Sequence, residues 1–201
     1  EGMQAGEEIF SVYDLDNLAA EALMFQTGYI TVESVRGSSY TMNYPNLEVK
    51  AAFTEHLLMS YMTGRRNSGF LLLSEYLREE NFDAFFETMT AVFASVPYTL
   101  SAQKDEAYFH TVFYLMMSAS GADAGTEILT NRGRIDMAVV FRDKIFIIEF
   151  KCGQSADAAI AQIITKGYAE RFRHKGKKIV LVGIDFSPEK RNIEDWKAET
   201  V

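Results

Sequence analysis

Two apolar runs separated by only two charged residues constrain the fold of this 201-residue chain more than any other feature. Residues 135–141 read IDMAVVF, residues 144–150 read KIFIIEF, and Arg142 and Asp143 lie between them. Short runs rich in valine, isoleucine and phenylalanine are typical of buried strands. The two-residue connection predicts a tight antiparallel hairpin, in which the numbers of facing residues sum to 285, as 142 and 143 do.

This register places two carboxylates opposite each other. Asp136 and Glu149 also sum to 285, so we expect them to be cross-strand neighbours, about 4.5–5.5 Å apart at Cβ. Lys151 shares the face of Glu149, because side chains alternate along a strand. Neighbouring carboxylates repel unless a cation lies between them, and oxygen ligands suit Mg²⁺ or Mn²⁺. Such a site can hydrolyse a phosphodiester. The three residues alone are better explained as charged strand ends that emerge into solvent, because so short a pattern often arises by accident.

A longer pattern decides between these interpretations. Residues 133–151, GRIDMAVVFRDKIFIIEFK, resemble the motif of the PD-(D/E)XK nuclease superfamily, and the similarity continues through residues 159–197. It is strongest to the branch attached to AAA-ATPase-like domains in bacterial proteins. The resemblance implies a restriction-endonuclease-like α/β fold, with a mixed β-sheet flanked by helices, and a Mg²⁺-dependent (or Mn²⁺-dependent) nuclease. DNA is the expected substrate.

The same resemblance assigns roles to residues. Asp136 and Glu149 would ligate the metal, and Lys151 would position the attacking water. Glu106, on the preceding helix, would be a further metal ligand, and His110 on the same helix face would be an accessory residue. A surface glutamate and a half-buried histidine are the alternatives for these two. Ile135 stands where the motif has proline.

The helix after the lysine departs from the family pattern. Related nucleases commonly carry QxxxY there, whereas Lys166 occupies the fourth position after Gln162 and Tyr168 follows two residues later. We therefore expect Gln162 to face the site and Tyr168 to pack elsewhere. Basic residues gather from 166 to 178, which predicts phosphate contacts; complementing a helix dipole is the alternative. The predicted nucleic-acid-binding residues are Gln162, Lys166, Arg171, Arg173, Lys175 and Lys177.

Pro97 and its polar neighbours predict a boundary between two domains, residues 1–99 and 100–201. The first is expected to be mostly helical and winged-helix-like, with a short β-hairpin around Gly37. It resembles the segment that links an ATPase domain to the nuclease domain. The second is expected to contain a helix, the hairpin, a long helix over 155–172 and a strand at 177–186, of which 178–184 is parallel to 144–150 by the right-handed crossover rule.

Composition narrows the remaining possibilities. The 201 residues contain no GxxxxGK[ST] motif, so ATP binding through a P-loop is not expected, and an ATPase domain is predicted elsewhere in the full-length chain. The single cysteine favours the cytoplasm, and no apolar run suggests a membrane span. The net charge of −8 leaves a local basic site possible. The rival function is a catalytically silent nucleic-acid-binding or protein-interaction module regulated by the ATPase domain. The oligomeric state stays open.

Overall fold

The computed structural model describes residues 3–10, 19–61, 68–96 and 106–201. The chain forms two compact units, Glu1–Phe53 and Thr54–Val201. The predicted domain boundary between Thr99 and Leu100 lies outside the described residues. Helical residues 68–95 contribute to the hydrophobic core of the second unit.

The first unit contains a small antiparallel sheet with the strand order β1-β3-β2. Its hydrophobic core is formed by Ile9, Ile30 and Met42. The predicted hairpin around Gly37 is confirmed, because Arg36 pairs with Ser39 across the turn. The elements are β1 (Met3–Ala5), η1 (Glu7–Phe10), α1 (Ala20–Gln26), β2 (Thr31–Arg36), β3 (Ser39–Asn43) and α2 (Leu47–Tyr61), of which α2 continues into the second unit.

The second unit is built on a five-stranded mixed sheet, which confirms the expected α/β fold class. The strands are β4 (Ala124–Thr130), β5 (Gly133–Val140), β6 (Lys144–Cys152), β7 (Lys178–Ser187) and β8 (Asn192–Thr200), and they lie side by side in that order. Only β6 and β7 are parallel, as the crossover rule predicted. β8 was not predicted as a strand; it pairs antiparallel with β7.

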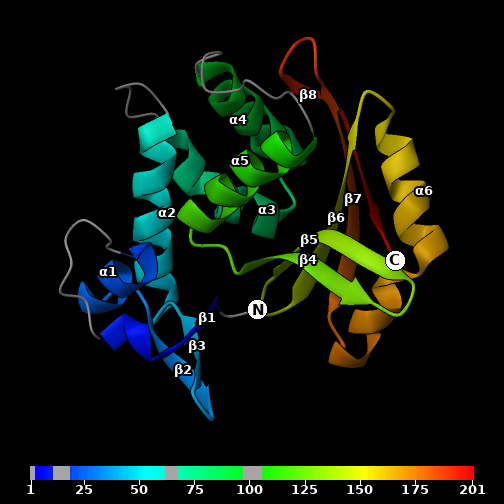
Figure 1. Cartoon of the computed structure of the whole chain (residues 1–201). Helices are drawn as coiled ribbons and strands as arrows, with labels where there is room; N and C mark the ends of the chain where they lie inside the picture. The colour runs from blue at the N-terminus through cyan, green and yellow to red at the C-terminus, as the bar shows by residue number, and fades with distance from the viewer. Residues whose placement is uncertain (1–2, 11–18, 62–67, 97–105) are drawn as a thin grey trace. The chain divides into compact units, whose positions relative to one another are not determined.

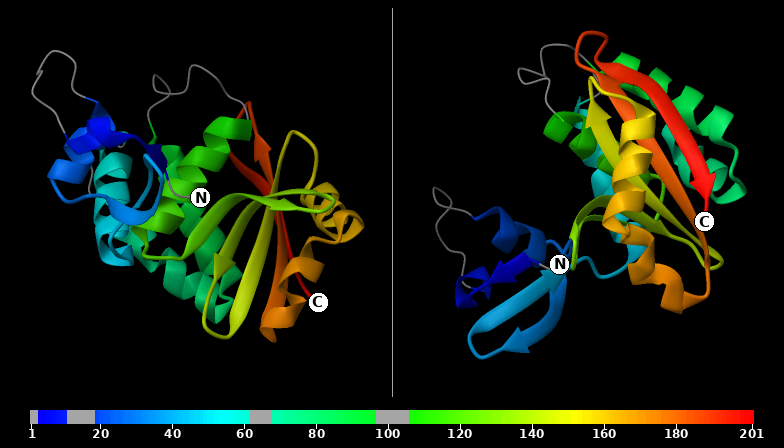
Figure 2. Two further views of the ribbon diagram at one scale, coloured as in Figure 1. Left: turned by 60° about the horizontal axis from the view of Figure 1, so that its bottom comes forward. Right: turned by 90° about the vertical axis from the view of Figure 1, so that its right-hand side faces the viewer.

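Helices cover both faces of this sheet (Figure 1). One face carries η3 (Ser68–Leu72), α3 (Leu73–Glu79), α4 (Phe82–Ser95) and α5 (Glu106–Ala119). The other carries α6 (Ala156–Lys166) and η5 (Tyr168–Lys175), as Figure 2 shows. The alternation of β6 explains the two layers: Phe146 and Ile148 enter the larger core with α3 to α5, whereas Ile145 and Ile147 enter the smaller core with α6.

The central hairpin has the predicted register. The pairs run from Val140 with Ile145 to Met137 with Ile148, and each sums to 285. The tight turn is closed by a hydrogen bond of 2.9 Å from the N–H of Phe141 to the carbonyl oxygen of Lys144. The charged pair Arg142-Asp143 therefore sets which β6 residues lie beside β5.

The helix after β6 is shorter than the sequence predicted. It begins after Ser155, whose Oγ accepts the N–H of Ala158 at 3.0 Å, and it ends at Lys166 rather than near residue 172. Gly167 has a left-handed conformation with φ of 62°, which terminates the helix. The chain then continues as the 3₁₀ segment η5 in a new direction.

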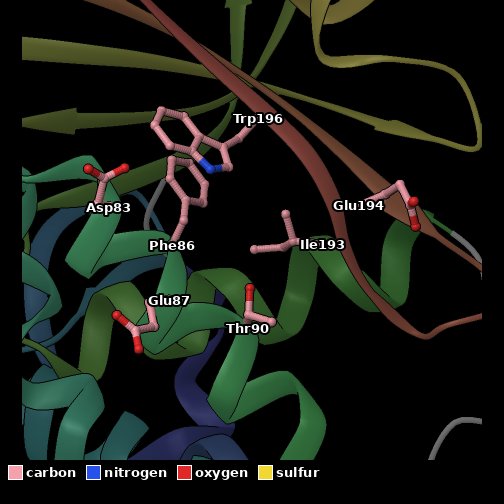
Figure 3. Close-up of a pocket in the computed structure, with 7 residues that line it drawn as sticks. All are labelled: Asp83, Phe86, Glu87, Thr90, Ile193, Glu194 and Trp196. Atoms are coloured by element: carbon pink, nitrogen blue, oxygen red, sulfur yellow. The ribbon is translucent and has the colours of Figure 1, made fainter.

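The last strand is attached to α4 by an aromatic stack. Trp196 on β8 lies 4.4 Å from Phe86 between ring centroids, with 12° between the ring planes. A hollow with a carboxylate-rich rim lies beside this stack (Figure 3), and Asp83, Glu87 and Glu194 are among the residues that line it. In the described residues, no helix is both long and apolar enough to span a membrane.

Candidate active site

Asp136 lies where β5 leaves the hydrogen-bonded ladder. The pairing with β6 stops at Met137, one residue short of the expected pair of Asp136 with Glu149. Instead, Oδ2 of Asp136 accepts the backbone N–H of Phe150 at 2.9 Å. The pairing with β4 is also interrupted beside Asp136, at Glu127, whose φ is 55°. The carboxylate thus occupies a gap in the ladder and is held by the backbone of β6.

Glu149 is a buried carboxylate with only 1% of its surface exposed. Its Oε1 accepts a hydrogen bond from the side-chain amide of Gln162 on α6 and lies 3.5 Å from Nζ of Lys151. Its Oε2 is buried and has no hydrogen-bond partner among the described residues. Glutamate is rarely buried in this way without full pairing, so a structural role alone does not explain Glu149.

Both acids have raised proton affinities, and Asp136 contributes to that of Glu149. Burial, followed by repulsion from Asp136, raises the pKa of Glu149 to about 8, and the Lys151 charge only partly opposes this rise. Burial also raises the pKa of Asp136, against the effects of the Phe150 N–H and of the charges on His110 and Lys151. The site therefore favours either a proton or another positive charge between the carboxylates.

His110 is hydrogen-bonded to the backbone of Asp136. Its Nε2 lies 3.0 Å from the carbonyl oxygen of Asp136 and donates to it, because a carbonyl can only accept. Its Nδ1 lies 3.7 Å from Oε1 of Glu127, which also forms an ion pair with Arg134. His110 is thus half-buried and contacts the main chain of Asp136, as its structural alternative implied, and its accessory role remains a prediction.

Sequence reasoning missed Glu127. The turn between β4 and β5 pairs Thr130 with Gly133, so facing residues sum to 263 and Glu127 falls opposite Asp136. The negative charge of Glu127 adds to the rise in the pKa of Asp136. Applying the hairpin argument to residues 124–140 would have found it.

Lys151 lies on β6, at the same end of the sheet as Glu149. Its Nζ donates to the carbonyl oxygen of Phe150 at 3.1 Å, and its side chain is 12% exposed. Asp185 on β7, its partner in the parallel register, is also buried. Oδ1 of Asp185 accepts the N–H of Gln154 at 3.0 Å and so holds the loop after β6. Asp185 was another residue that sequence reasoning missed.

Tyr168 packs in the smaller core, as expected, but its hydroxyl also lies near Gln162, so the expectation that it points away from the site is wrong. Burial raises the pKa of Tyr168, and so does the negative charge of Glu149, while a hydrogen bond with Gln162 opposes the rise. The expectation assumed one continuous helix, in which residues six apart point in different directions. The left-handed Gly167 ends that helix and redirects the chain, so Tyr168 returns toward Gln162. The predicted position of Gln162 itself is confirmed by its contact with Glu149.

Glu106 is exposed at the first turn of α5. Among the described residues, no group of three or more histidine, cysteine, aspartate or glutamate side chains is arranged to hold a metal ion, so the structure does not bring Glu106 together with the acid pair in such a group. Its role as a metal ligand remains a prediction.

The basic residues after α6 have different environments. Lys166, Arg173 and Lys175 are exposed to solvent. Arg171, also exposed, donates to the carbonyl oxygen of Leu129, and Nζ of Lys177 donates to that of Phe141 at 2.7 Å. Lys177 is therefore bonded to the turn after β5, whereas the exposed cations are accessible to phosphates.

Comparisons with known proteins agree with this arrangement over the second half of the chain. Residues 104–196 match the family model described as PD-(D/E)XK nuclease superfamily. A protein of Azotobacter chroococcum mcd 1, described as "Uncharacterized protein in vnfD 5'region", is 34% identical over 215 aligned residues, which include the whole of this chain. The chain spans 41% of the length of that relative. No solved structure matches the chain significantly.

Asp136 and Glu149 fit a divalent cation chemically. Both present oxygen atoms, which are the ligands that Mg²⁺ and Mn²⁺ prefer, and Mg²⁺ is commonly bound by one or two carboxylates with water and phosphate completing its shell. The unpaired Oε2 of Glu149 provides a ligand atom that nothing else in the described chain uses. The pKa values of both acids are raised mainly by burial, and the Lys151 charge offsets this rise only in part.

Replacing Glu149 with glutamine is expected to stabilise the metal-free protein at pH 8. The pKa of Glu149 is about 8 in the folded state and lies near 4.5 for an ordinary glutamate, so the native state binds the proton more tightly. The associated stability is fully present below about pH 4.5 and is lost as pH rises through 8. In thermal melts with EDTA, we expect Glu149→Gln to raise Tm by roughly 5–10 °C at pH 8 and by little near pH 4.5.

The matched control is Glu75→Gln, which neutralises an exposed glutamate of α3. This substitution should change the free energy of unfolding by no more than about 0.5 kcal/mol at both pH values. A Glu149→Gln variant that is less stable than the unsubstituted protein at pH 8 would contradict the electrostatic account. Mn²⁺ should stabilise the unsubstituted protein at pH 8 more than Glu149→Gln.

Proposed function

We propose that this protein hydrolyses phosphodiester bonds of nucleic acid, most directly DNA, in a reaction that depends on Mg²⁺ or Mn²⁺. The observation that carries the proposal is the buried Glu149, which has an unpaired oxygen and a pKa raised to about 8 beside Asp136 and Lys151. These residues fall inside the stretch that matches the nuclease superfamily. A buried acid pair destabilises the metal-free fold, so a functional role accounts for it better than a structural one.

Asp136 and Glu149 would hold the cation. A divalent ion in this position supplies positive charge that stabilises the negative charge developing on the phosphate. Gln162 fixes the orientation of Glu149 through Oε1, and the Phe150 N–H fixes that of Asp136. His110 positions the backbone of Asp136. Each carboxylate is therefore oriented before a ligand arrives, which lowers the cost of assembling the site.

Lys151 would orient the attacking water by donating a hydrogen bond to its oxygen. The water oxygen forms a new bond to phosphorus and gives up a proton, the bond from phosphorus to the leaving sugar oxygen breaks, and the leaving oxygen takes up a proton, so one water is added across the bond. The Lys151 ammonium lies 3.5 Å from Glu149, so the water would be placed at the edge of the acid pair. General acid–base and positioning effects of this type contribute about 10²–10⁴-fold to rates.

The first test is cleavage of supercoiled, linear and single-stranded DNA, and of RNA, with Mg²⁺ or Mn²⁺. We expect cutting that EDTA stops and that Asp136→Asn reduces by at least about 100-fold. Asp143→Asn is the matched control, because this aspartate lies exposed in the hairpin turn. It should cut like the unsubstituted protein.

Equal cutting by Asp136→Asn would place the activity elsewhere or in a contaminant. No cutting by any version, with nucleic-acid binding retained, would favour the catalytically silent module. We further propose that the protein acts in the cytoplasm and that an ATPase-like region belongs to the full-length protein. The greater length of the Azotobacter relative is compatible with such a region.

A further inference from the structure

A cavity of about 540 Å³ lies between β4, β5 and η5, on the face of the sheet that carries α6. Its floor is apolar and includes Ile128, Ala138, Val140 and Phe172. Figure 2 shows η5 following α6 along this face. The volume lies within the range of about 300–1,000 Å³ that is typical of small-molecule pockets.

The rim of this cavity is mainly basic. Arg171, His174 and Lys175 of η5 line it, and Asp123 is the acid among the lining residues. Arg171 is anchored by its hydrogen bond to the carbonyl oxygen of Leu129, which leaves other guanidinium N–H groups available. Nζ of Lys175 lies 5.6 Å from the centre of the Phe172 ring. The cavity thus combines an apolar floor with cations suited to phosphate.

The cavity adjoins the candidate active site along β5. Ala138 is two residues from Asp136 and Val140 is four residues from it, so the floor begins roughly 7 Å along the strand and extends to about 13 Å. A nucleic-acid strand rises about 3.4 Å per nucleotide in a duplex and more when it is extended. A strand with its scissile phosphate at Asp136 can therefore place a nearby nucleotide over the cavity.

We propose that this cavity receives an unpaired nucleotide of the substrate strand, and that the protein consequently prefers single-stranded nucleic acid or unpaired ends. The inference rests on the proposed nuclease function. The apolar floor suits a base and its sugar, and the basic rim suits the adjoining phosphate. A base inside a duplex is stacked and paired, so it enters a pocket only after it is extruded, at a cost of a few kcal/mol. Single strands avoid this cost.

The test is binding without cleavage, measured by fluorescence anisotropy in EDTA. The probes are a labelled oligothymidylate and a blunt DNA hairpin with the same number of phosphates. We expect the single strand to bind about tenfold more tightly, because contact of one base with a protein surface contributes on this scale. Val140→Trp fills the cavity and should bring the two affinities within about twofold of each other. Lys175→Glu reverses one charge at the rim of the cavity. It should lower the preference for the single strand over the hairpin at least about threefold.

Lys190→Glu is the matched control, since it makes the same charge change at an exposed lysine that pairs with Glu194 on the last hairpin. Its preference for the single strand should equal that of the unsubstituted protein. Thermal melting verifies that each variant is folded, and Lys175→Glu decides the result if Val140→Trp is not folded. Equal affinity of the unsubstituted protein for both probes overturns the inference, as does a preference that persists in the folded variants.

The two proposals fail separately. Metal-dependent cutting without a preference for single strands would contradict the proposed nucleotide cavity but support the nuclease function. A preference for single strands that depends on Lys175, together with no cutting under any metal condition, would contradict the nuclease function. It would still support a cavity that binds single strands.

Discussion

Replacing Lys151 with methionine is expected to reduce metal-dependent DNA cleavage at least about 100-fold, measured at saturating Mn²⁺. Methionine keeps an unbranched side chain of similar length but removes the ammonium, which lies 3.5 Å from Glu149. Without the ammonium, the side chain at position 151 cannot donate a hydrogen bond to the attacking water. The loss of a neighbouring positive charge also raises the pKa of Glu149 further and changes the affinity of the site for metal, so the metal concentration must be varied.

Two further variants separate charge from position at Lys151. Lys151→Arg keeps the charge but replaces a compact ammonium with a planar group, so we expect it to lose activity as well. Lys190→Met removes an exposed ammonium that pairs with Glu194, and it should cut within about twofold of the unsubstituted protein. A Lys151→Met variant that retains more than about a tenth of the activity would refute the assigned role.

Replacing Gly183 with alanine is expected to cost at least about 3 kcal/mol of stability and to lower Tm by roughly 6–12 °C. Gly183 lies on β7 opposite Glu149, beneath the first turns of α6. A Cβ at this position would lie 2.4 Å from the carbonyl oxygen of Ala156 and 3.0 Å from atoms of Ala159 and Ile160. The nearest atom belongs to the backbone and cannot rotate away, so the helix itself must move.

The same displacement should impair the site, because α6 carries the Gln162 side chain that contacts Glu149. We therefore expect the folded fraction of Gly183→Ala to lose cleavage as well as stability. Gly125→Ala is the control for stability, because its new Cβ would meet only the Ile128 side chain, at 3.4 Å. Thermal melts should show a change of less than about 1 kcal/mol for this variant. An unchanged Tm for Gly183→Ala would contradict the close packing of α6 on β7.

The central hairpin could be predicted from sequence because its determinants are local. Two apolar runs and a two-residue turn allow one register, and that register brings Asp136, Glu149 and Lys151 to the same end of the sheet. The parallel pairing of β6 and β7 followed from the handedness of the crossover. The mixed sheet with helices on both faces was predictable for the same reasons.

Other features depend on contacts between segments that are distant in the chain. The left-handed turn at Gly167 redirects Tyr168 toward Gln162, whereas a helical periodicity argument continues past the glycine. β8 carries many charged residues, and its pairing with β7 and the stack of Trp196 on Phe86 reveal it as a strand. Periodicity in a sequence reports which face is apolar; it does not report which distant segment covers that face.

The residue types and their register were thus determined by the sequence alone: an acid pair with a lysine at the end of a predicted hairpin. The tertiary structure decided their physical state. Burial of Glu149 beneath α6 removes water from its carboxylate, raises its pKa to about 8 and leaves Oε2 without a described partner. Desolvation depends on everything packed around a group, so no local pattern encodes it. The apolar cavity beside Asp136 likewise exists only because η5 folds back over β4 and β5.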